Sequence, residues 1–200
     1  MQPLKTHRGL IATLDRANVD TDQIIAKQFL KSIARTGFGE HLFYDWGHRP
    51  DGTLNPEFSL NLPRFKAASI LVARNNFGSG SSREHAVWAI QQYGFKAVMA
   101  PSYADIFKNN ASKNALLTIE LKESEIEEIF QKVDSTLGLE ATIDIPSQRV
   151  TLHLPKEVSF PFNLDPAVKE RLLRGLDDIG ITLKYEEALR VFESKHNVQL

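Results

Sequence analysis

Between residues 67 and 121, short apolar runs alternate with stretches of helical periodicity, and this alternation limits the possible folds more than any other feature. The expected strands span residues 67–73, 97–100 and 116–121, and the expected helices span residues 82–93 and 102–109. Strands that alternate with helices favour parallel pairing through crossover connections. An acidic amphipathic helix is then expected over residues 123–133, and a hairpin over 139–145 and 149–154. Periodicity alone therefore predicts a mixed α/β fold.

The first of these strands runs into a glycine-rich turn. Residues 75–89 read Asn-Asn-Phe-Gly-Ser-Gly-Ser-Ser-Arg-Glu-His-Ala-Val-Trp-Ala. Gly78 and Gly80 can adopt positive φ angles, so the backbone can turn tightly and bring its N–H groups near a ligand. The pattern predicts an anion-binding turn between the strand and the next helix.

The start of that helix supports the prediction. Ser81 followed by Glu84 fits a capping box, which would begin the helix near Ser82. The N–H groups and the dipole of a helix start attract a carboxylate or phosphate, and Arg83 adds a charge able to hold one in a bidentate pair. The alternative is structural: Ser81 is only a cap, Glu84 its partner and His85 a partly buried polar residue. Residue spacing leaves both interpretations open.

Several function classes are not expected. A dinucleotide fingerprint requires a third glycine where Arg83 stands, and a P-loop requires Gly-Lys-Ser/Thr. Lys and Arg number 24 against 25 for Asp and Glu, so no basic field favours nucleic acid. No stretch approaches the roughly 20 apolar residues that span a bilayer, and residues 1–15 lack the apolar core of a signal peptide. We therefore expect no nucleic-acid or membrane binding, and a cytoplasmic location.

The chain has no cysteine, which limits its part in any metal chemistry. It cannot supply thiolates to an iron–sulfur cluster. Its six histidines are scattered without a His-x-x-x-His pair, so we expect no metal site built by this chain alone. If this protein takes part in a reaction that needs a metal, another polypeptide must hold that metal.

Three segments of the chain carry a resemblance to a known family. The run Asn-Phe-Gly-Ser-Gly-Ser-Ser-Arg-Glu-His-Ala at residues 76–86 is similar to the signature of the swivelling domain of the aconitase superfamily. Residues 18–25, Asn-Val-Asp-Thr-Asp-Gln-Ile-Ile, resemble the small subunit of bacterial 3-isopropylmalate dehydratase, together with motifs between Phe29 and Trp46. A third segment, from Pro101 to Leu117, fits the same family. The three segments occur in the family's order and cover most of the chain.

The resemblance implies an α/β fold of a particular kind, the three-layer swivelling β/β/α domain. We expect this domain over residues 1–163 and a C-terminal helical tail over residues 164–200. Asp165 and Pro166 are suited to open a first tail helix that ends near Leu176, and a second helix is expected over residues 185–195. The apolar positions of the tail are expected to pack on the core, with contact to a partner subunit as the alternative.

The resemblance also implies an activity and a partner. Enzymes of this family isomerise 2-isopropylmalate and 3-isopropylmalate by dehydration and rehydration through 2-isopropylmaleate, in leucine biosynthesis. By analogy, a 4Fe-4S cluster held by cysteines of a large subunit binds the departing hydroxyl, and Ser81 of this chain is the base. Ser82 and Arg83 match positions that contact a substrate carboxylate, and Gly80 belongs to the same substrate-binding turn. This chain would bind no cofactor itself, and the substrate is a small dicarboxylate.

An earlier segment is expected to set substrate specificity. Rough alignment with relatives places Arg35 on a carboxylate and Asp22 beside it, although surface ion pairs and capping are alternative roles for both. Leu30 and Ile33 offer the apolar surface that an isopropyl group needs. Departures from the usual pattern, such as Ala26 where proline is common, leave two alternatives open. These are a related hydratase for citramalate/citraconate or dimethylmalate, and a non-catalytic carboxylate-binding module.

Overall fold

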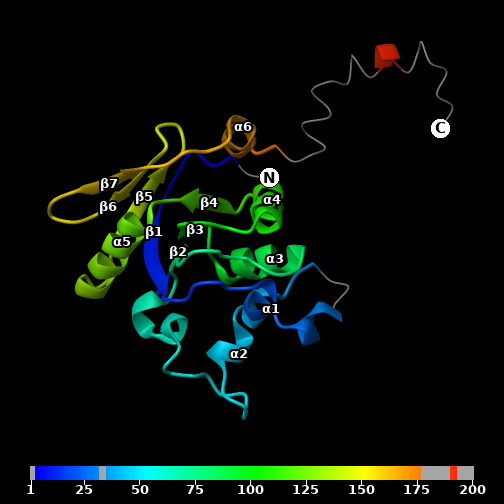
Figure 1. Ribbon diagram of the computed structural model, residues 1–200, viewed down its shortest axis with the longest axis vertical. Coiled ribbons are helices and arrows are strands. Elements are labelled where there is room, and N and C mark those ends of the chain that lie inside the picture. The colour runs from blue at the N-terminus through cyan, green and yellow to red at the C-terminus, as the bar shows by residue number, and fades with distance from the viewer. Residues whose placement is uncertain (1–2, 32–34, 177–189, 193–200) are drawn as a thin grey trace.

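The computed structural model describes residues 3–31, 35–176 and 190–192, and its centre is a seven-stranded sheet in the order β4-β3-β2-β1-β5-β6-β7 (Figure 1). The strands are β1 (Thr6–Leu14), β2 (Ile70–Ala73), β3 (Ala97–Ala100), β4 (Leu117–Glu120), β5 (Glu140–Asp144), β6 (Arg149–Leu152) and β7 (Val158–Pro161). Strands β1 to β4 are parallel, whereas β5, β6 and β7 continue from β1 in antiparallel pairing. The mixed α/β fold predicted from periodicity is confirmed.

Strand β1 joins the two halves of the sheet. Its residues from Thr6 to Leu10 pair with β5, and those from Ile11 to Leu14 pair with β2. The first half of the strand is partly exposed, whereas the last four residues are fully buried. This difference in burial along the strand explains why the sequence did not reveal β1. Its first half, Thr-His-Arg-Gly-Leu, has the polar composition of a strand in a sheet with one solvent-exposed face.

The helices are short at the amino-terminal end of the chain and longer around the sheet. They are α1 (Thr21–Ile24), α2 (Tyr44–Gly47), α3 (Glu84–Tyr93), α4 (Asp105–Lys113), α5 (Glu123–Ser135) and α6 (Pro166–Arg174), with 3-10 turns at Lys27–Lys31, Gly39–His41, Ser59–Asn61 and Pro63–Phe65. Helix α5 packs on β1, β2 and β3, and in Figure 1 it lies across the sheet from α3 and α4. The parallel half of the sheet is therefore covered on both faces.

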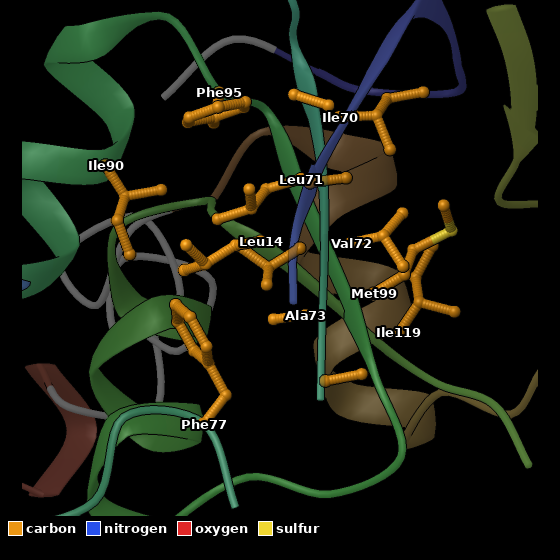
Figure 2. Packing of buried hydrophobic residues seen from close by; sticks show 14 of the residues in the cluster. Leu14, Ile70, Leu71, Val72, Ala73, Phe77, Ile90, Phe95, Met99 and Ile119 are labelled. Carbon is orange, nitrogen blue, oxygen red and sulfur yellow. The ribbon is translucent and has the colours of Figure 1, made fainter. Parts of the chain in front are cut away.

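Side-chain burial follows from this layering. All four residues of β2 and of β3 are buried, because helices cover both faces of these strands. Figure 2 shows Leu71 on the side of Ile90 and Phe95, and Ile70 and Val72 on the opposite side of the strand. In β5 buried and half-buried residues alternate, as expected where only one face meets the core.

The element boundaries differ from the predictions at several points. Helix α3 begins at Glu84 instead of Ser82, α4 is displaced toward the C-terminus, and β1 and β7 were not predicted. In the tail, the Asp165 carboxylate caps α6 by accepting hydrogen bonds from the amides of Ala167 (2.9 Å) and Val168 (3.2 Å), as predicted. Leu172 of this helix is buried in the core.

The expected second tail helix, residues 185–195, lies mostly outside the described residues. Within this range only residues 190–192 are described, and they are helical. The division of the chain at residue 163 stays a prediction. None of the described helices is long and apolar enough to cross a membrane.

The Tyr103 side chain bridges β3 and β4, and this contact generates a stability prediction. Its buried hydroxyl lies 2.6 Å from the Val98 carbonyl oxygen and 3.0 Å from that of Ile119, and burial raises the pKa of the phenol well above its ordinary value. Tyr103→Phe should lower the free energy of unfolding by about 1–3 kcal/mol, because the single hydroxyl hydrogen that it removes donates to a buried carbonyl oxygen.

Chemical denaturation measures this loss. The control is Tyr93→Phe, whose hydroxyl lies at 3.4 Å from the Leu60 carbonyl oxygen on a side chain that is 41% exposed. This control should change stability by less than about 0.5 kcal/mol. Equal effects of the two substitutions would contradict the role given to Tyr103.

Candidate active site

The glycine-rich turn lies between the end of β2 and the start of α3, and a distant segment is hydrogen-bonded along it. The amides of Gly78 and Ser79 donate to the Val19 carbonyl (2.7 and 3.1 Å), and the Thr21 amide donates to the Ser79 carbonyl (2.8 Å). Asp20 and Ser79 form a parallel β-bridge. The fold thus brings together the residue 18–25 and 76–86 segments, which are more than 50 positions apart in the sequence.

Both glycines of the turn have the positive φ angles predicted from the sequence. Gly78 has φ +76°, and a side chain there would overlap the buried ring of Phe107. Gly80 has φ +93°, and a side chain there would make only ordinary contacts with Asp20 and Thr21, so glycine is needed for its backbone conformation more than for space. Gly78 therefore holds the turn against α4, and Gly80 directs the next residue, Ser81, to the surface.

Ser81 is exposed at the tip of the turn and does not cap the helix. The N-cap position of α3 is Arg83, whose side chain makes no capping hydrogen bond. The carboxylate of Glu84 accepts a hydrogen bond from the side-chain amide of Asn114 (2.7 Å) instead of reaching back to the turn. The capping box predicted from Ser81 and Glu84 is wrong, because Asn114 of the neighbouring helix end competes for the glutamate.

Thr21 holds the backbone of Ser81. The Ser81 amide donates to the Thr21 hydroxyl oxygen, and that hydroxyl donates to the Ser81 carbonyl, both over 3.1 Å. The two side-chain oxygens lie 3.4 Å apart. Thr21 is only 2% exposed, whereas the Ser81 it holds faces outward. An accessible hydroxyl on a firmly held backbone is the arrangement required by an active site that the surface of a second protein completes.

Arg83 and Asp22 form an ion pair beside this serine. The Arg83 side chain is 19% exposed, and its Nη1 contacts Oδ1 of Asp22. The other carboxylate oxygen of Asp22 lies 3.7 Å from the exposed ammonium group of Lys27. The structure thus brings together two predicted site residues, Asp22 and Arg83, and adds Lys27, which the sequence did not single out. The positive charges of Arg83 and Lys27, which outnumber the single carboxylate of Asp22, and the N-terminus of α3 favour a carboxylate at this position.

The remaining predicted residues lie at different distances from the turn. Ser82 is exposed next to Ser81, and its carbonyl accepts from Asn110 of α4 (3.4 Å). The Arg35 guanidinium lies over the Trp88 ring at 5.7 Å, and its carbonyl accepts from Gln92 (2.8 Å), so its contacts are along the side of α3.

Two further candidates belong to the neighbouring segment. Leu30 packs half-buried against the core, and Ile33 lies outside the described residues. His85 packs against the rings of Phe38 and Trp88 at centroid distances of 5.2 and 4.8 Å. A half-buried position among aromatic rings fits the structural interpretation of His85.

Within the described part of the chain, no group of three or more His, Cys, Asp or Glu residues could hold a metal ion. The chain also has no cysteine for an iron–sulfur cluster.

Known proteins share this sequence and fold. Residues 1–124 match the model of the aconitase C-terminal domain family. The chain is 50% identical over 205 aligned residues to a 3-isopropylmalate dehydratase small subunit from Desulforapulum autotrophicum, covering 98% of this chain and 96% of that protein. The chain belongs to the aconitase family. Within that family it belongs with the 3-isopropylmalate dehydratase small subunits.

A solved structure agrees with this family assignment. The crystal structure of 3-isopropylmalate dehydratase from Methanocaldococcus jannaschii has a TM-score of 0.64 and 25% sequence identity to this chain. The match covers 96% of this chain and 99% of the other. The aconitase-family swivelling fold that the resemblance implied is thereby confirmed.

The tight packing at Gly78 generates a second prediction. Gly78→Ala combines a left-handed backbone, which costs an L-residue about 1–2 kcal/mol, with overpacking against Phe107, which costs about 1–3 kcal/mol. We expect the free energy of unfolding to fall by about 2–5 kcal/mol in a urea titration.

Gly138→Ala is the matched control. Gly138 has a similar φ of +73°, but nothing lies within 4 Å of the added carbon. Its loss should be limited to the backbone part, about 1–2 kcal/mol. A Gly78 variant no less stable than the Gly138 variant would show that Phe107 does not restrain the turn.

Proposed function

We propose that this chain is the small subunit of a hydro-lyase that interconverts 2-isopropylmalate and 3-isopropylmalate through 2-isopropylmaleate, in leucine biosynthesis in the cytoplasm. The single observation that carries the proposal is an exposed Ser81 on an anion-binding turn beside Arg83, in a chain 50% identical to a 3-isopropylmalate dehydratase small subunit. A site so open to solvent needs a second surface to exclude water. That surface belongs to a large subunit.

In this proposal Ser81 is the base. Its oxygen, as the alkoxide, takes the carbon-bound proton next to a substrate carboxylate; the C–H electrons form the double bond, and the hydroxyl leaves from the adjacent carbon. Rehydration runs these steps backward with the hydroxyl added to the other carbon. A cysteine-ligated 4Fe-4S cluster on the large subunit would supply a Lewis acid for the departing hydroxyl.

The surroundings of Ser81 favour its negative form. The N-terminal amides of α3 and the Arg83 guanidinium place positive potential next to the hydroxyl, which lowers the free energy of the alkoxide relative to the alcohol. The ion pair with Asp22 fixes the orientation of the guanidinium before substrate arrives. Preorganisation of this kind is the main way that a protein stabilises charge at a reacting atom.

The substrate is bound through its carboxylates and its alkyl group. Arg83, Ser82 and the backbone of Gly80 hold one carboxylate, because they surround the turn on its exposed side. Leu30 and Ile33 contribute apolar surface for the isopropyl group, and Arg35 approaches a carboxylate from the side of α3. A methylene more or less in an apolar pocket changes discrimination by only about 1–3 kcal/mol, so citraconate and dimethylmaleate are the competing substrates.

Replacing the proposed base tests the function directly. The chain is co-expressed anaerobically with a cluster-bearing large subunit, and hydration of isopropylmaleate, citraconate and dimethylmaleate is compared. Ser81→Ala should assemble normally while hydration falls at least about 100-fold, because a positioned base contributes about 10²–10⁴ in rate. Ser124→Ala, an exposed serine on α5, is the control and should hydrate isopropylmaleate normally.

Near-normal turnover by an assembled Ser81→Ala complex would exclude the proposed mechanism. A wild-type complex that assembles but hydrates none of the three alkenes would instead support the alternative of a carboxylate-binding module without chemistry. The ranking of the three alkenes by the wild-type complex identifies the substrate.

Arg83→Lys tests the carboxylate clamp. A point charge replaces a planar fork, so the KM for isopropylmalate should rise roughly 10- to 100-fold, the loss of one charge-assisted hydrogen bond. Arg149→Lys on β6, an exposed arginine that contacts Ser159 at 3.1 Å, is the control for arginine replacement. Unchanged KM in the Arg83 variant would show that this residue serves only the pair with Asp22.

A further inference from the structure

Thr21 is a buried hydroxyl in direct contact with the proposed base, and no step of the mechanism above uses it. It occupies the first position of α1, after Asp20, whose carboxylate caps that helix by accepting from the Gln23 amide (2.7 Å). Its own amide donates to the Ser79 carbonyl (2.8 Å). Bonds on both sides of the residue therefore fix the Thr21 hydroxyl relative to the turn.

The Thr21 hydroxyl has one hydrogen and two acceptors within reach. Its oxygen already accepts from the Ser81 amide, and its hydrogen points to the Ser81 carbonyl at 3.1 Å. The Ser81 hydroxyl oxygen, at 3.4 Å, is the second acceptor. Rotation about the C–O bond of Thr21 moves the hydrogen between these two oxygens without moving any heavy atom.

The preferred acceptor changes with the charge on Ser81. A hydrogen bond to an ionised oxygen is shorter and about twice as strong as one to a neutral oxygen. Contacts to reacting groups that are long in a free enzyme also tighten in the substrate complex. Since Thr21 is only 2% exposed, water cannot easily take its place, and the buried surroundings strengthen the bond.

We propose that Thr21 is a positioning residue for Ser81, which holds the serine backbone in the neutral enzyme and donates its hydrogen to the serine oxygen when that oxygen is negative. This inference rests on the proposed function, because it acts only through a catalytic Ser81. It gives a catalytic reason for the contact between Thr21 and Ser81, which are 60 positions apart in the sequence.

Thr21→Val removes the hydroxyl and keeps the shape of the side chain. In the complex with the large subunit, its kcat should fall roughly 10- to 100-fold while KM changes by less than about twofold, as expected for a hydrogen bond to a charged group formed in the reaction. The rise of kcat/KM with pH should move to higher pH, because the alkoxide loses a donor. Thr21→Ser, which retains the hydroxyl, should recover most of the rate and the original pH profile.

Two controls separate this role from a structural one. Thr118→Val removes a buried hydroxyl from β4 and should leave kcat and the pH profile unchanged. Assembly and thermal midpoint are measured for each variant. If Thr21→Val does not assemble, Thr21→Cys replaces it, since a thiol is a weak donor and should give a smaller kcat loss and a smaller shift of the pH profile in the same direction.

The inference is overturned if an assembled Thr21→Val complex keeps the wild-type kcat and pH profile while Ser81→Ala is inactive. It is also overturned if Thr21→Ser loses as much activity as Thr21→Val. An active Ser81→Ala complex is a different result, because it removes the proposed catalytic role of Ser81 and with it the basis of this inference.

Discussion

Strand β1 pairs antiparallel with β5 over its first half and parallel with β2 over its second half, and the position of every site residue depends on this division. The parallel half carries the chain out of the sheet at the same edge where β2 ends. The segment after β1 therefore meets the segment after β2, and Val19 and Thr21 bond to the glycine turn. Carboxyl ends of parallel strands are the usual place for ligands, since loops and helix N-termini converge there.

The second requirement of the site is charge held in a fixed place. Arg83 is mostly buried, and its guanidinium is paired with Asp22. An unpaired cation at this depth would be costly, and Asp22 supplies the opposite charge. The same ion pair joins α1 to the start of α3. Asp22 therefore both orients the Arg83 guanidinium and holds the two segments of the site together.

Much of the site could be predicted because its local requirements are strict. Glycine permits the positive φ predicted at Gly78 and Gly80, and both angles are observed. The capping box failed for the opposite reason: Glu84 has several possible donors, and Asn114, 30 positions away, competes for it. Lys27 and Thr21 carried no local sequence signal that distinguishes them from other polar residues. Their roles in the candidate site depend on contacts with residues far away in the sequence.

The alternation of apolar and helical runs by itself determined a mixed α/β chain with a glycine-rich turn after a buried strand, because backbone sterics and hydrophobic burial act over a few residues. The absence of cysteine determined that this chain supplies no thiolate to a cluster. Only the tertiary structure decided which residue holds Ser81 and which carboxylate faces Arg83. Hydrogen bonds and ion pairs form between any suitable groups that the fold brings within about 3–4 Å, and sequence separation does not limit that choice.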